Sequence, residues 1–229
     1  MDISLSGIEK KFEDSGRDRW IFKNMTAGFV SGQFSVIIGK SGVGKSSLLN
    51  LISGIDTPDS GLIQIGSSRV SDMDDTERTL FRRRHIGFIY QFFNLIPVLS
   101  VFDNITLVCR LDNQPRADYE DRALALLDQV GLFRRQNDYP DKLSGGEQQR
   151  VAIVRAMVND PDIILADEPT GNLDQETGQQ VLDMISYLAR ENQKTLVMVT
   201  HSTDAMACAD RSFRVEDQQL TDLGRELSV

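Results

Sequence analysis

The chain has 229 residues, enough for one large domain or for one domain that carries a smaller insertion. Hydrophobic residues make up 40% and charged residues 26%, which is ordinary for a soluble globular protein, and no apolar run approaches the ~20 residues that a membrane span requires. The net charge of −9 argues against nucleic acid as a partner, because neutralising phosphates needs clustered lysine and arginine.

The first residues, MDISLSGIEK, contain neither a basic region nor an apolar core, so the sequence predicts no signal peptide. Eight segments rich in β-branched and aromatic residues predict strands. Two of them, 34–39 (FSVIIG) and 162–168 (DIILADE), are nearly continuous apolar runs, which indicates burial on both faces of a parallel sheet. The predicted strands are 3–8, 21–30, 34–39, 62–66, 86–91, 162–168, 195–201 and 212–215.

Residues 39–47, GKSGVGKSS, lie between a predicted strand and the helical run SSLLNLIS, and they match the phosphate-loop pattern G-x-x-x-x-G-K-[ST]. Gly42 and Gly44 let backbone N–H groups close on phosphate oxygens, and the following helix adds its positive end. Lys45 would bridge the β- and γ-phosphates, and the Ser46 hydroxyl would ligate Mg²⁺. The strand–loop–helix context favours this interpretation over a merely flexible loop. The predicted nucleotide-binding residues here are Gly39, Ser41, Gly42, Val43, Gly44, Lys45, Ser46 and Ser47.

The only basic run of the chain, Arg82-Arg83-Arg84-His85, has two interpretations. It is either the solvated end of a helix or a contact with a partner or an anionic lipid. The cysteines, Cys109 and Cys208, have neither metal-binding nor disulfide-framework spacing. We therefore expect them to be small buried side chains in a reducing, cytosolic compartment.

The middle of the chain has a helical character. Residues 92–157 show helical patterns and loops but no convincing strand, which predicts a helical subdomain inserted into a core formed by 1–91 and 158–229. Periodicity is clear in 117–132, where Gly131 reads as the C-terminal stop, and again in 176–192. The apolar faces consist of Ala123, Leu126, Leu127 and Val130 in the first segment and of Val181, Met184, Ile185 and Leu188 in the second.

Residues 143–150, LSGGEQQR, place Ser-Gly-Gly at the start of an apparently helical run. A helix interior penalises each glycine by about 1 kcal/mol relative to alanine, so these glycines need a reason. Ser144, Gly145 and Gly146 at a helix opening leave backbone N–H groups free beside a hydroxyl, an arrangement that suits an anion. The phosphate loop is already an anion site, and one of the two sites therefore needs another explanation.

The segment DIILADEPTGNLD carries two adjacent acids. Four apolar residues, 163–166, place the strand in the sheet, so that Asp167 and Glu168 come at its carboxyl end, where ligands bind in open α/β sheets. Asp167 would hold Mg²⁺ directly or through water, and Glu168 is placed to polarise a water that attacks the γ-phosphate. Two adjacent acids can also be a helix cap or a turn pair, but the phosphate loop favours the catalytic interpretation.

The phosphate loop, LSGGEQQR and DIILADEPTGNLD together resemble the motifs of ABC-type ATPases, in the order of that family and over nearly the whole chain. The resemblance implies one α/β domain, 1–229: a P-loop NTPase (RecA-like) core with a mostly parallel sheet, an N-terminal antiparallel β portion and an inserted helical subdomain. It also implies that Ser144, Gly145 and Gly146 cap the γ-phosphate held by a second copy, so that a homodimer encloses two ATP molecules.

The same resemblance assigns further residues. Gln91 matches the glutamine that senses Mg²⁺ and the attacking water, and His201 matches the histidine that contacts the γ-phosphate. Asp174, in GNLD, matches the acid that communicates across the dimer. Phe12 occupies the place of the aromatic that stacks on adenine, where the family commonly has tyrosine, and Trp20 is a rival for that role. The implied catalytic residues are thus Glu168, His201 and Gln91, and the implied Mg²⁺ ligands are Ser46, Gln91 and Asp167.

The segment 91–105, QFFNLIPVLSVFDNI, resembles bacterial ATPases of the lipoprotein-release, macrolide-efflux and cell-division group, as do LADEPTGNLD and LSGGEQQRVAIVRA. In that group the ATPase is often a separate chain that docks onto a membrane permease with a large periplasmic domain. Residues 92–97 include an apolar cluster that is unusual for an exposed loop. Part of it could belong to the subdomain's own core, and the remainder would form a groove that receives a permease helix. Its members are Phe92, Phe93, Leu95, Ile96 and Pro97.

The resemblance therefore implies an ATPase subunit that uses ATP and Mg²⁺, dimerises on ATP and drives an integral membrane permease in export, extraction or mechanotransmission. Such a subunit lies in the cytoplasm, on the cytoplasmic face of the inner membrane. The alternative is a non-transporting ATPase whose permease-like partner regulates envelope enzymes, and the two share every motif of this chain. A soluble ABC ATPase of DNA repair or translation would carry coiled-coil insertions, two cassettes or basic surfaces, and the sequence shows none of them.

Overall fold

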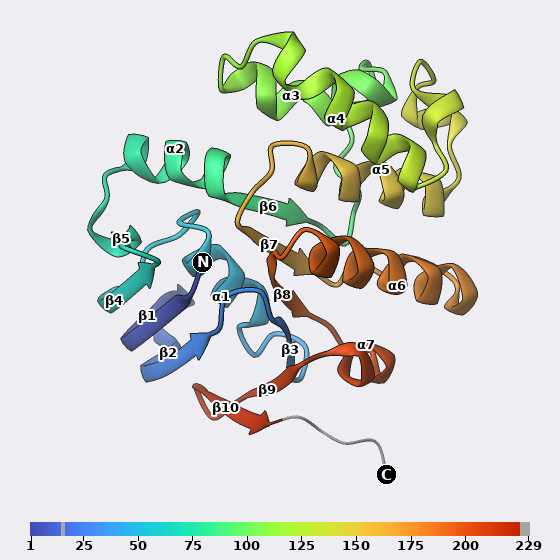
Figure 1. Cartoon of the computed structure of the whole chain (residues 1–229). Helices are drawn as coiled ribbons and strands as arrows, with labels where there is room; N and C mark the ends of the chain where they lie inside the picture. Colours follow the sequence, from blue (N-terminus) through green and yellow to red (C-terminus); the bar gives the residue numbers. More distant parts are fainter. Residues whose placement is uncertain (15–16, 225–229) are drawn as a thin grey trace.

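The computed structural model describes residues 1–14 and 17–224 and contains two sheets (Figure 1). The first is antiparallel, with strand order β2-β1-β4-β5; the second has the order β10-β9-β3-β8-β7-β6 and is parallel except for β10. This arrangement confirms the predicted α/β fold. The strands are β1 (Ile3–Asp14), β2 (Arg17–Phe29), β3 (Phe34–Ile38), β4 (Ser60–Ile65), β5 (Ser68–Arg69), β6 (Ile86–Ile89), β7 (Ile163–Asp167), β8 (Thr195–Val199), β9 (Arg211–Glu216) and β10 (Gln219–Gly224).

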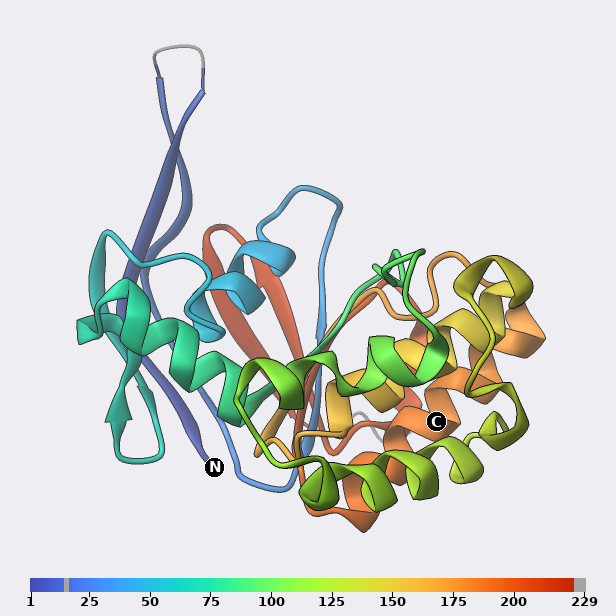
Figure 2. The same ribbon diagram turned by 90° about the horizontal axis from the view of Figure 1, so that it is seen from above.

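Helices cover both faces of the parallel sheet. Helix α1 follows β3, whereas α3, α4 and α5 form a group at one end of the molecule, beside α6 (Figures 1 and 2). Among the described residues, no helix is long and apolar enough to cross a bilayer. The helices are α1 (Lys45–Ile52), α2 (Asp75–His85), α3 (Val101–Leu111), α4 (Arg116–Gln129), α5 (Gly145–Met157), α6 (Gln175–Glu191) and α7 (Thr203–Cys208), with 3₁₀ turns at Val70–Asp72, Phe133–Arg135 and Pro140–Lys142.

The parallel sheet is buried on both faces, as its apolar runs predict. In β7, Ile163 and Leu165 pack with α1 and the antiparallel sheet, whereas Ile164 and Ala166 pack with the helices on the other side. Fully burying an isoleucine or leucine side chain contributes about 1.5–3 kcal/mol relative to leaving it exposed. The two cores therefore hold the carboxyl ends of these strands in fixed positions, and Asp167 is the last residue of β7.

The segment between β6 and β7 contains α3, α4, α5 and 3₁₀ turns, and in this described part of the chain it contains no strand. Helix α4 ends as its sequence predicts: Gly131 has a φ of 72°, the left-handed conformation that glycine adopts at a helix end. The four residues of its predicted apolar face are all buried. Cys109 is buried on α3 and Cys208 is partly buried, and burial raises the pKa of both thiols.

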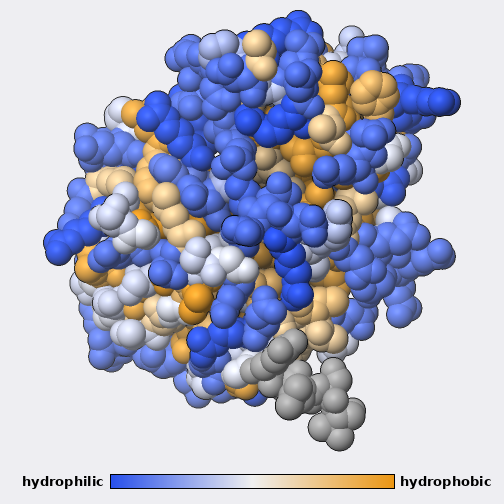
Figure 3. Space-filling model, viewed as in Figure 1, coloured by the Kyte–Doolittle hydropathy of each residue, from blue (hydrophilic) through white to orange (hydrophobic). Residues whose placement is uncertain are grey.

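Strands β1 and β2 extend well beyond the predicted segments 3–8 and 21–30 and form a long hairpin that stands out from the body (Figure 2). Their outer halves are rich in charged residues, which are depleted in strands, so composition alone did not indicate the extension. The face of the molecule shown in Figure 3 is mostly hydrophilic, and its apolar patches are interrupted by charged residues.

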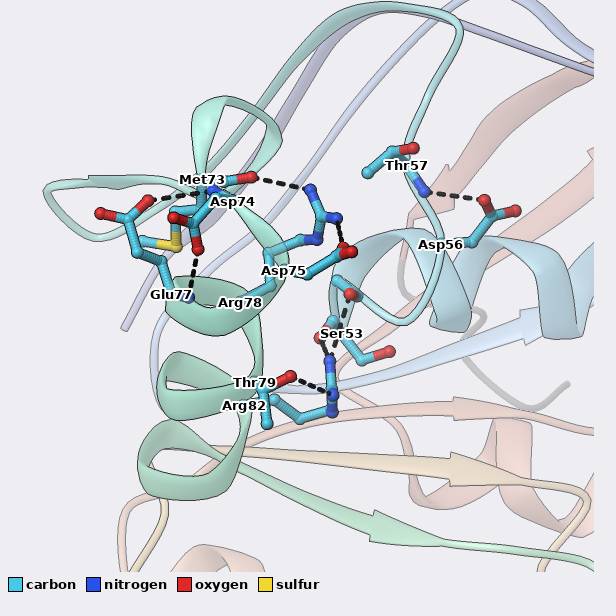
Figure 4. A network of polar contacts seen from close by, with 11 residues as sticks. Ser53, Asp56, Thr57, Met73, Asp74, Asp75, Glu77, Arg78, Thr79 and Arg82 are labelled. Atoms are coloured by element: carbon cyan, nitrogen blue, oxygen red, sulfur yellow. Dashed lines mark hydrogen bonds and ion pairs between the residues drawn. The ribbon is translucent and has the colours of Figure 1, made fainter.

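Helix α2 is not among the predicted helices, because its one buried residue, Phe81, gives no apolar periodicity. It begins with a capping box in which the Asp74 side chain accepts from the Glu77 N–H and the Glu77 side chain accepts from the Asp74 N–H (Figure 4). The spacing of this aspartate and glutamate is the sequence signal that could have located the helix. Arg78 donates to the carbonyl of Met73 and pairs with Asp75, which fixes the same end of α2.

The basic run forms the last turn of α2, as the helix-end interpretation predicts, with Arg84 exposed and the other three side chains partly buried. Contact with a partner or an anionic lipid stays a prediction. The side chains of the run contact acceptors elsewhere in the chain and join α2 to the end of α1, to the end of α3 and to the residue before β7. Arg82 donates to the carbonyls of Ser53 and Gly54, Arg83 to the carbonyl of Leu111 and Arg84 to the Asp112 carboxylate, while His85 Nδ1 lies 2.8 Å from Asp162 Oδ2.

Candidate active site

A cavity of about 600 Å³ opens where the parallel strands end. Its walls come from the loop after β3, the ends of β6, β7 and β8, and one strand of the hairpin. This is the edge of an open α/β sheet at which ligands bind. The lining residues are Arg19, Ile21, Ser41, Gly42, Gly44, Lys45, Ser46, Ser47, Gln91, Asp167, Glu168, Gly171 and His201.

The phosphate loop runs from the end of β3 into α1 and lies against β2. Gly42 and Gly44 have φ values of 72° and 111°, which side chains with a Cβ rarely adopt. A Cβ on Gly44 would lie 2.4 Å from Cγ2 of Ile21, so this position also lacks space. Glycine is therefore required at Gly44 both by backbone conformation and by contact with the hairpin.

Lys45 is 7% exposed and its ammonium is held over the loop. Nζ donates to the carbonyl oxygens of Gly39 at 2.9 Å and Lys40 at 3.2 Å. Burial lowers the pKa of Lys45, and the nearby carboxylates of Glu168 and Asp167 act in the opposite direction. A phosphate oxygen in the cavity would give this partly desolvated cation a full negative charge as its partner.

Ser46 and Asp167 provide the oxygen atoms that a hard cation requires. The Ser46 hydroxyl donates to Asp167 Oδ1 at 3.1 Å, and burial raises the pKa of Asp167, although this hydrogen bond and Lys45 oppose the rise. Mg²⁺ in nucleotide sites commonly takes one or two protein oxygens together with substrate phosphates and water. Among the described residues no cluster of three or more histidine, cysteine or acidic side chains could hold a metal without such a substrate. The pair therefore fits a nucleotide-bound Mg²⁺.

Glu168 and His201 lie side by side although they follow different strands. Glu168 Oε1 is 3.2 Å from His201 Nε2, and Oε2 accepts the backbone N–H of His201 at 3.2 Å. Glu168 has a φ of 46°, unusual for a residue with a side chain, and such strain is frequent at functional sites. Gln91 lines the same cavity, and its backbone carbonyl accepts from the Asn172 side chain at 2.9 Å. The structure thus brings the three predicted catalytic side chains to one cavity.

Ser144, Gly145 and Gly146 do not line this cavity. Ser144 caps α5: its Oγ accepts the N–H of Glu147, and the Glu147 carboxylate accepts the Ser144 N–H at 2.8 Å, which lowers the pKa of Glu147. A Cβ on Gly146 would lie 2.6 Å from Cγ2 of Thr177 on α6. Capping and close helix packing therefore give Ser-Gly-Gly structural reasons. The Ser-x-x-Glu spacing is a local signal for the cap that sequence reasoning missed, whereas the packing of Gly146 has no local signal. Ser144 and Gly145 remain exposed.

Asp174 and Phe12 also lie outside the lining of the cavity. Asp174 caps α6 by accepting the Thr177 N–H at 3.0 Å, and this backbone hydrogen bond lowers its pKa. Phe12 is 43% exposed on β1, and its ring centroid lies 5.1 Å from the Lys10 ammonium. The proposed contacts of both residues with nucleotide remain predictions.

The apolar cluster after Gln91 divides between the two interpretations given for it. Leu95 packs against the helical core, and Phe93 is partly buried, whereas Phe92 is 68% exposed. Ile96 at 37% and Val98 at 80% are exposed as well. Part of the cluster therefore belongs to the core, and the exposed part is available to a partner.

Sequence reasoning missed Arg19, Ile21 and Gly171 as lining residues, and it missed Arg155, which braces the segment after Gln91. Arg155 donates to the carbonyls of Asn94 at 2.6 Å and Phe93 at 2.8 Å, and burial lowers its pKa. No local pattern marks these residues, because their positions depend on contacts between distant segments.

Comparisons with known proteins agree with this geometry. The sequence profile of the ABC transporter family matches residues 22–171. An uncharacterized ABC transporter ATP-binding protein of Mycobacterium tuberculosis is 45% identical over 218 residues, 95% of this chain and 88% of the relative. The lipoprotein-releasing system ATP-binding protein LolD of Hydrogenovibrio crunogenus is 39% identical over 215 residues, 94% of each chain.

Solved structures agree as well. The ATP-binding cassette MJ0796, a dimer in a post-hydrolysis state bound to ADP and Pi, has a TM-score of 0.88 and 35% identity to this chain. The match covers 99% of this chain and 100% of the cassette. A further dimeric structure of MJ0796 has the same TM-score and 36% identity.

Proposed function

Because the chain belongs to the ABC transporter family, as an ATP-binding domain, we propose that it hydrolyses MgATP between two copies of itself and thereby drives a membrane permease. The observation that carries this proposal is the convergence of Lys45, Ser46, Asp167, Glu168 and His201 on one cavity at the carboxyl edge of the sheet.

Each of these residues has a task that its contacts support. Lys45 exchanges its two backbone carbonyls for phosphate oxygens, and Ser46 with Asp167 holds Mg²⁺, which neutralises charge on the β- and γ-phosphates when bound. Glu168 orients and deprotonates the attacking water, and His201, 3.2 Å from Glu168, contacts the γ-phosphate. Gln91, which lines the same cavity, would contact Mg²⁺ and the attacking water.

The second copy completes the site. Ser144 and Gly145 are exposed at the start of α5 and do not line their own chain's cavity. The Ser144 N–H donates to Glu147, so the groups available to a γ-phosphate held by a partner are the Ser144 hydroxyl and the Gly145 N–H. Two structures of one relative, the cassette MJ0796, are dimers, one of them with ADP and Pi. Asp174, at the start of α6, would lie at the same interface, and Phe12 would stack on adenine.

The permease contact is proposed at the exposed apolar residues that follow Gln91. Phe92, Ile96 and Val98 expose apolar surface beside a loop that Arg155 holds in place. A permease helix that packs there would transmit force to Gln91, and the chain would then work on the cytoplasmic face of the membrane. The relative named LolD, an ATP-binding protein of a lipoprotein-releasing system, agrees with the group that the sequence resembles and favours extraction or export at the envelope.

Two measurements test the proposal. The purified chain should hydrolyse ATP only when Mg²⁺ is present, and Glu168→Gln should bind ATP without hydrolysing it. Affinity purification from detergent-solubilised membranes should recover one integral membrane protein with this chain. A chain that hydrolyses no nucleotide, or a Glu168→Gln variant with the wild-type rate, would contradict the proposal.

A further inference from the structure

One cation lines the cavity without a task in the site described above. Arg19 lies on β2, in the hairpin that stands out from the body (Figure 2), and its side chain is exposed. Its Nη2 donates to the carbonyl oxygen of Gly42 at 2.9 Å. The guanidinium is therefore fixed at the rim of the phosphate loop, on the side of the hairpin.

The register of the hairpin separates Arg19 from its neighbour Trp20. Arg19 pairs with Phe12 and Trp20 with Lys11 in the antiparallel ladder, and opposed residues share a face while consecutive residues alternate. On the Trp20 face, the ammonium groups of Lys11 and Lys23 lie 5.7 and 5.8 Å from the indole ring. The face that bears Arg19 and Phe12 is the one that reaches the phosphate loop, which favours Phe12 over Trp20 as the residue that meets the base.

The positive charge of Arg19 is not neutralised by its hydrogen bond. A guanidinium has five N–H donors, and the carbonyl of Gly42 is neutral and takes one of them. Among the described side chains, no carboxylate forms an ion pair with Arg19, whereas Lys11 on the same hairpin pairs with Asp18. Arg19 thus presents several donors to the cavity that Asp167 and Glu168 also line.

We propose that Arg19 binds the α-phosphate of the bound adenine nucleotide and so sets the affinity for ATP and ADP alike. The inference rests on the proposed nucleotide-binding function. Consider a nucleotide whose base lies at the hairpin and whose terminal phosphate lies between Lys45 and Glu168. Its α-phosphate, the one nearest the ribose, would then lie beside Arg19. Guanidinium groups suit this contact because their planar fork can donate two parallel hydrogen bonds to one phosphate.

Competition against a fluorescent ADP analogue tests the proposal with ADP, AMP and adenosine as competitors. Arg19→Gln removes the charge and keeps an amide donor. This variant should bind ADP and AMP more weakly by the same factor, on the order of tenfold, because a hydrogen bond to a charged group is lost. Adenosine has no phosphate, and its affinity should not change. Lys23→Gln removes one positive charge beside Trp20 and should bind all three competitors as the wild type does.

Three results would overturn the proposal: unchanged AMP affinity in Arg19→Gln, an equal loss for adenosine, or an equal loss in Lys23→Gln. The first would place the contact elsewhere, the second would indicate an effect on the base or the hairpin, and the third would indicate a nonspecific effect of charge. A wild-type chain that binds no ADP would instead refute the nucleotide-binding function itself. Circular dichroism of each variant checks that the hairpin variants fold.

Discussion

The ammonium of Lys45 lies 3.1 Å from Nε2 of His201, and the same Nε2 lies 3.2 Å from Oε1 of Glu168. Because the carboxylate is also 3.9 Å from the Lys45 ammonium, the three side chains form one cluster without nucleotide. In the proposed function, a γ-phosphate bound in the cavity would lie between the cation and the acid. The residues that bind phosphate and those that activate water are therefore already adjacent.

Lys45→Ala should abolish ATP turnover and weaken ATP binding by roughly 10- to 100-fold, since a charge-assisted hydrogen bond contributes about 1.5–3 kcal/mol. No other lysine lines the cavity to replace its charge between the β- and γ-phosphates. Steady-state hydrolysis and nucleotide titration measure the two effects, with thermal unfolding as the control for folding. Hydrolysis near the wild-type rate would show that Lys45 does not belong to the nucleotide site.

Asp167→Asn should abolish Mg²⁺-dependent hydrolysis and, in the absence of nucleotide, stabilise the protein at pH 7. Burial raises the pKa of Asp167 in the folded chain, so its contribution favours folding below its unfolded pKa and is lost as the pH rises through the folded pKa. Asparagine avoids the burial of charge and still accepts from Ser46. A gain on the order of 1 kcal/mol would raise Tm by about 2–4 °C for a chain of this size.

The stabilisation by Asp167→Asn should shrink as the pH falls through the raised pKa of Asp167 in the folded chain towards its unfolded pKa, because the buried wild-type carboxyl then takes up a proton and no longer buries a charge. Calorimetry at pH 7 and at pH 4 measures the difference. A variant that is less stable than the wild type at pH 7 would show that the carboxylate is already well compensated by Lys45 and Ser46.

Phe92→Ser with Val98→Ser should leave folding and ATP binding intact and reduce recovery of the membrane partner. Both side chains are exposed, at 68% and 80%, so their loss removes little from the core. Val30→Ser with Tyr187→Ser, two exposed apolar residues elsewhere, is the matched control. Co-purification from membranes measures the effect, and full recovery with the first pair would place the docking surface elsewhere.

How much of the site can be predicted from the sequence depends on whether a residue is positioned by its own segment of the chain or by contacts with distant segments. The phosphate loop could be predicted because the conformations of Gly42 and Gly44 and the position of Lys45 arise within nine residues of one strand–loop–helix unit. Asp167 could be placed because the apolar run before it predicts a buried strand, and the first acid after that run must lie at the carboxyl end of the strand. Arg19 could not, because its place in the cavity depends on the β1–β2 register and on contact with a loop more than twenty residues away.

Ser144 is a second example of the limit of prediction from the sequence. Its motif suggests an anion site, and the resemblance to ABC-type ATPases suggests a second chain. The capping box with Glu147 is local and its Ser-x-x-Glu spacing can be read in the sequence, but the packing of Gly146 on Thr177 is a tertiary contact. They explain why a serine and two glycines open α5 even in one isolated chain. A role toward nucleotide in a second chain must therefore be tested apart from this structural role.

Gly146→Ala should destabilise the protein by roughly 1–3 kcal/mol, since overpacking costs about that much and the new Cβ would lie 2.6 Å from Thr177 Cγ2. Thr177→Ser removes that methyl group, so adding Gly146→Ala to Thr177→Ser should cost much less than adding it to the wild type. Denaturant unfolding of the four proteins gives this coupling. Additive effects would show that α5 and α6 adjust without strain at this contact.

The last prediction isolates the role of Ser144 toward a second chain. Glu168→Gln keeps the size of the side chain but removes the basic carboxylate, so this variant should be monomeric without nucleotide and dimeric with MgATP. Ser144→Asn and Ser144→Asp, each added to Glu168→Gln, both preserve a good helix cap and have nearly the same shape. The asparagine variant should still dimerise, whereas the aspartate variant should not, because its carboxylate would face the partner's γ-phosphate between two chains that each carry a net charge of −9. Size exclusion with light scattering distinguishes the outcomes, and an MgATP dimer of the aspartate variant equal to that of the asparagine variant would exclude contact between Ser144 and the partner's nucleotide.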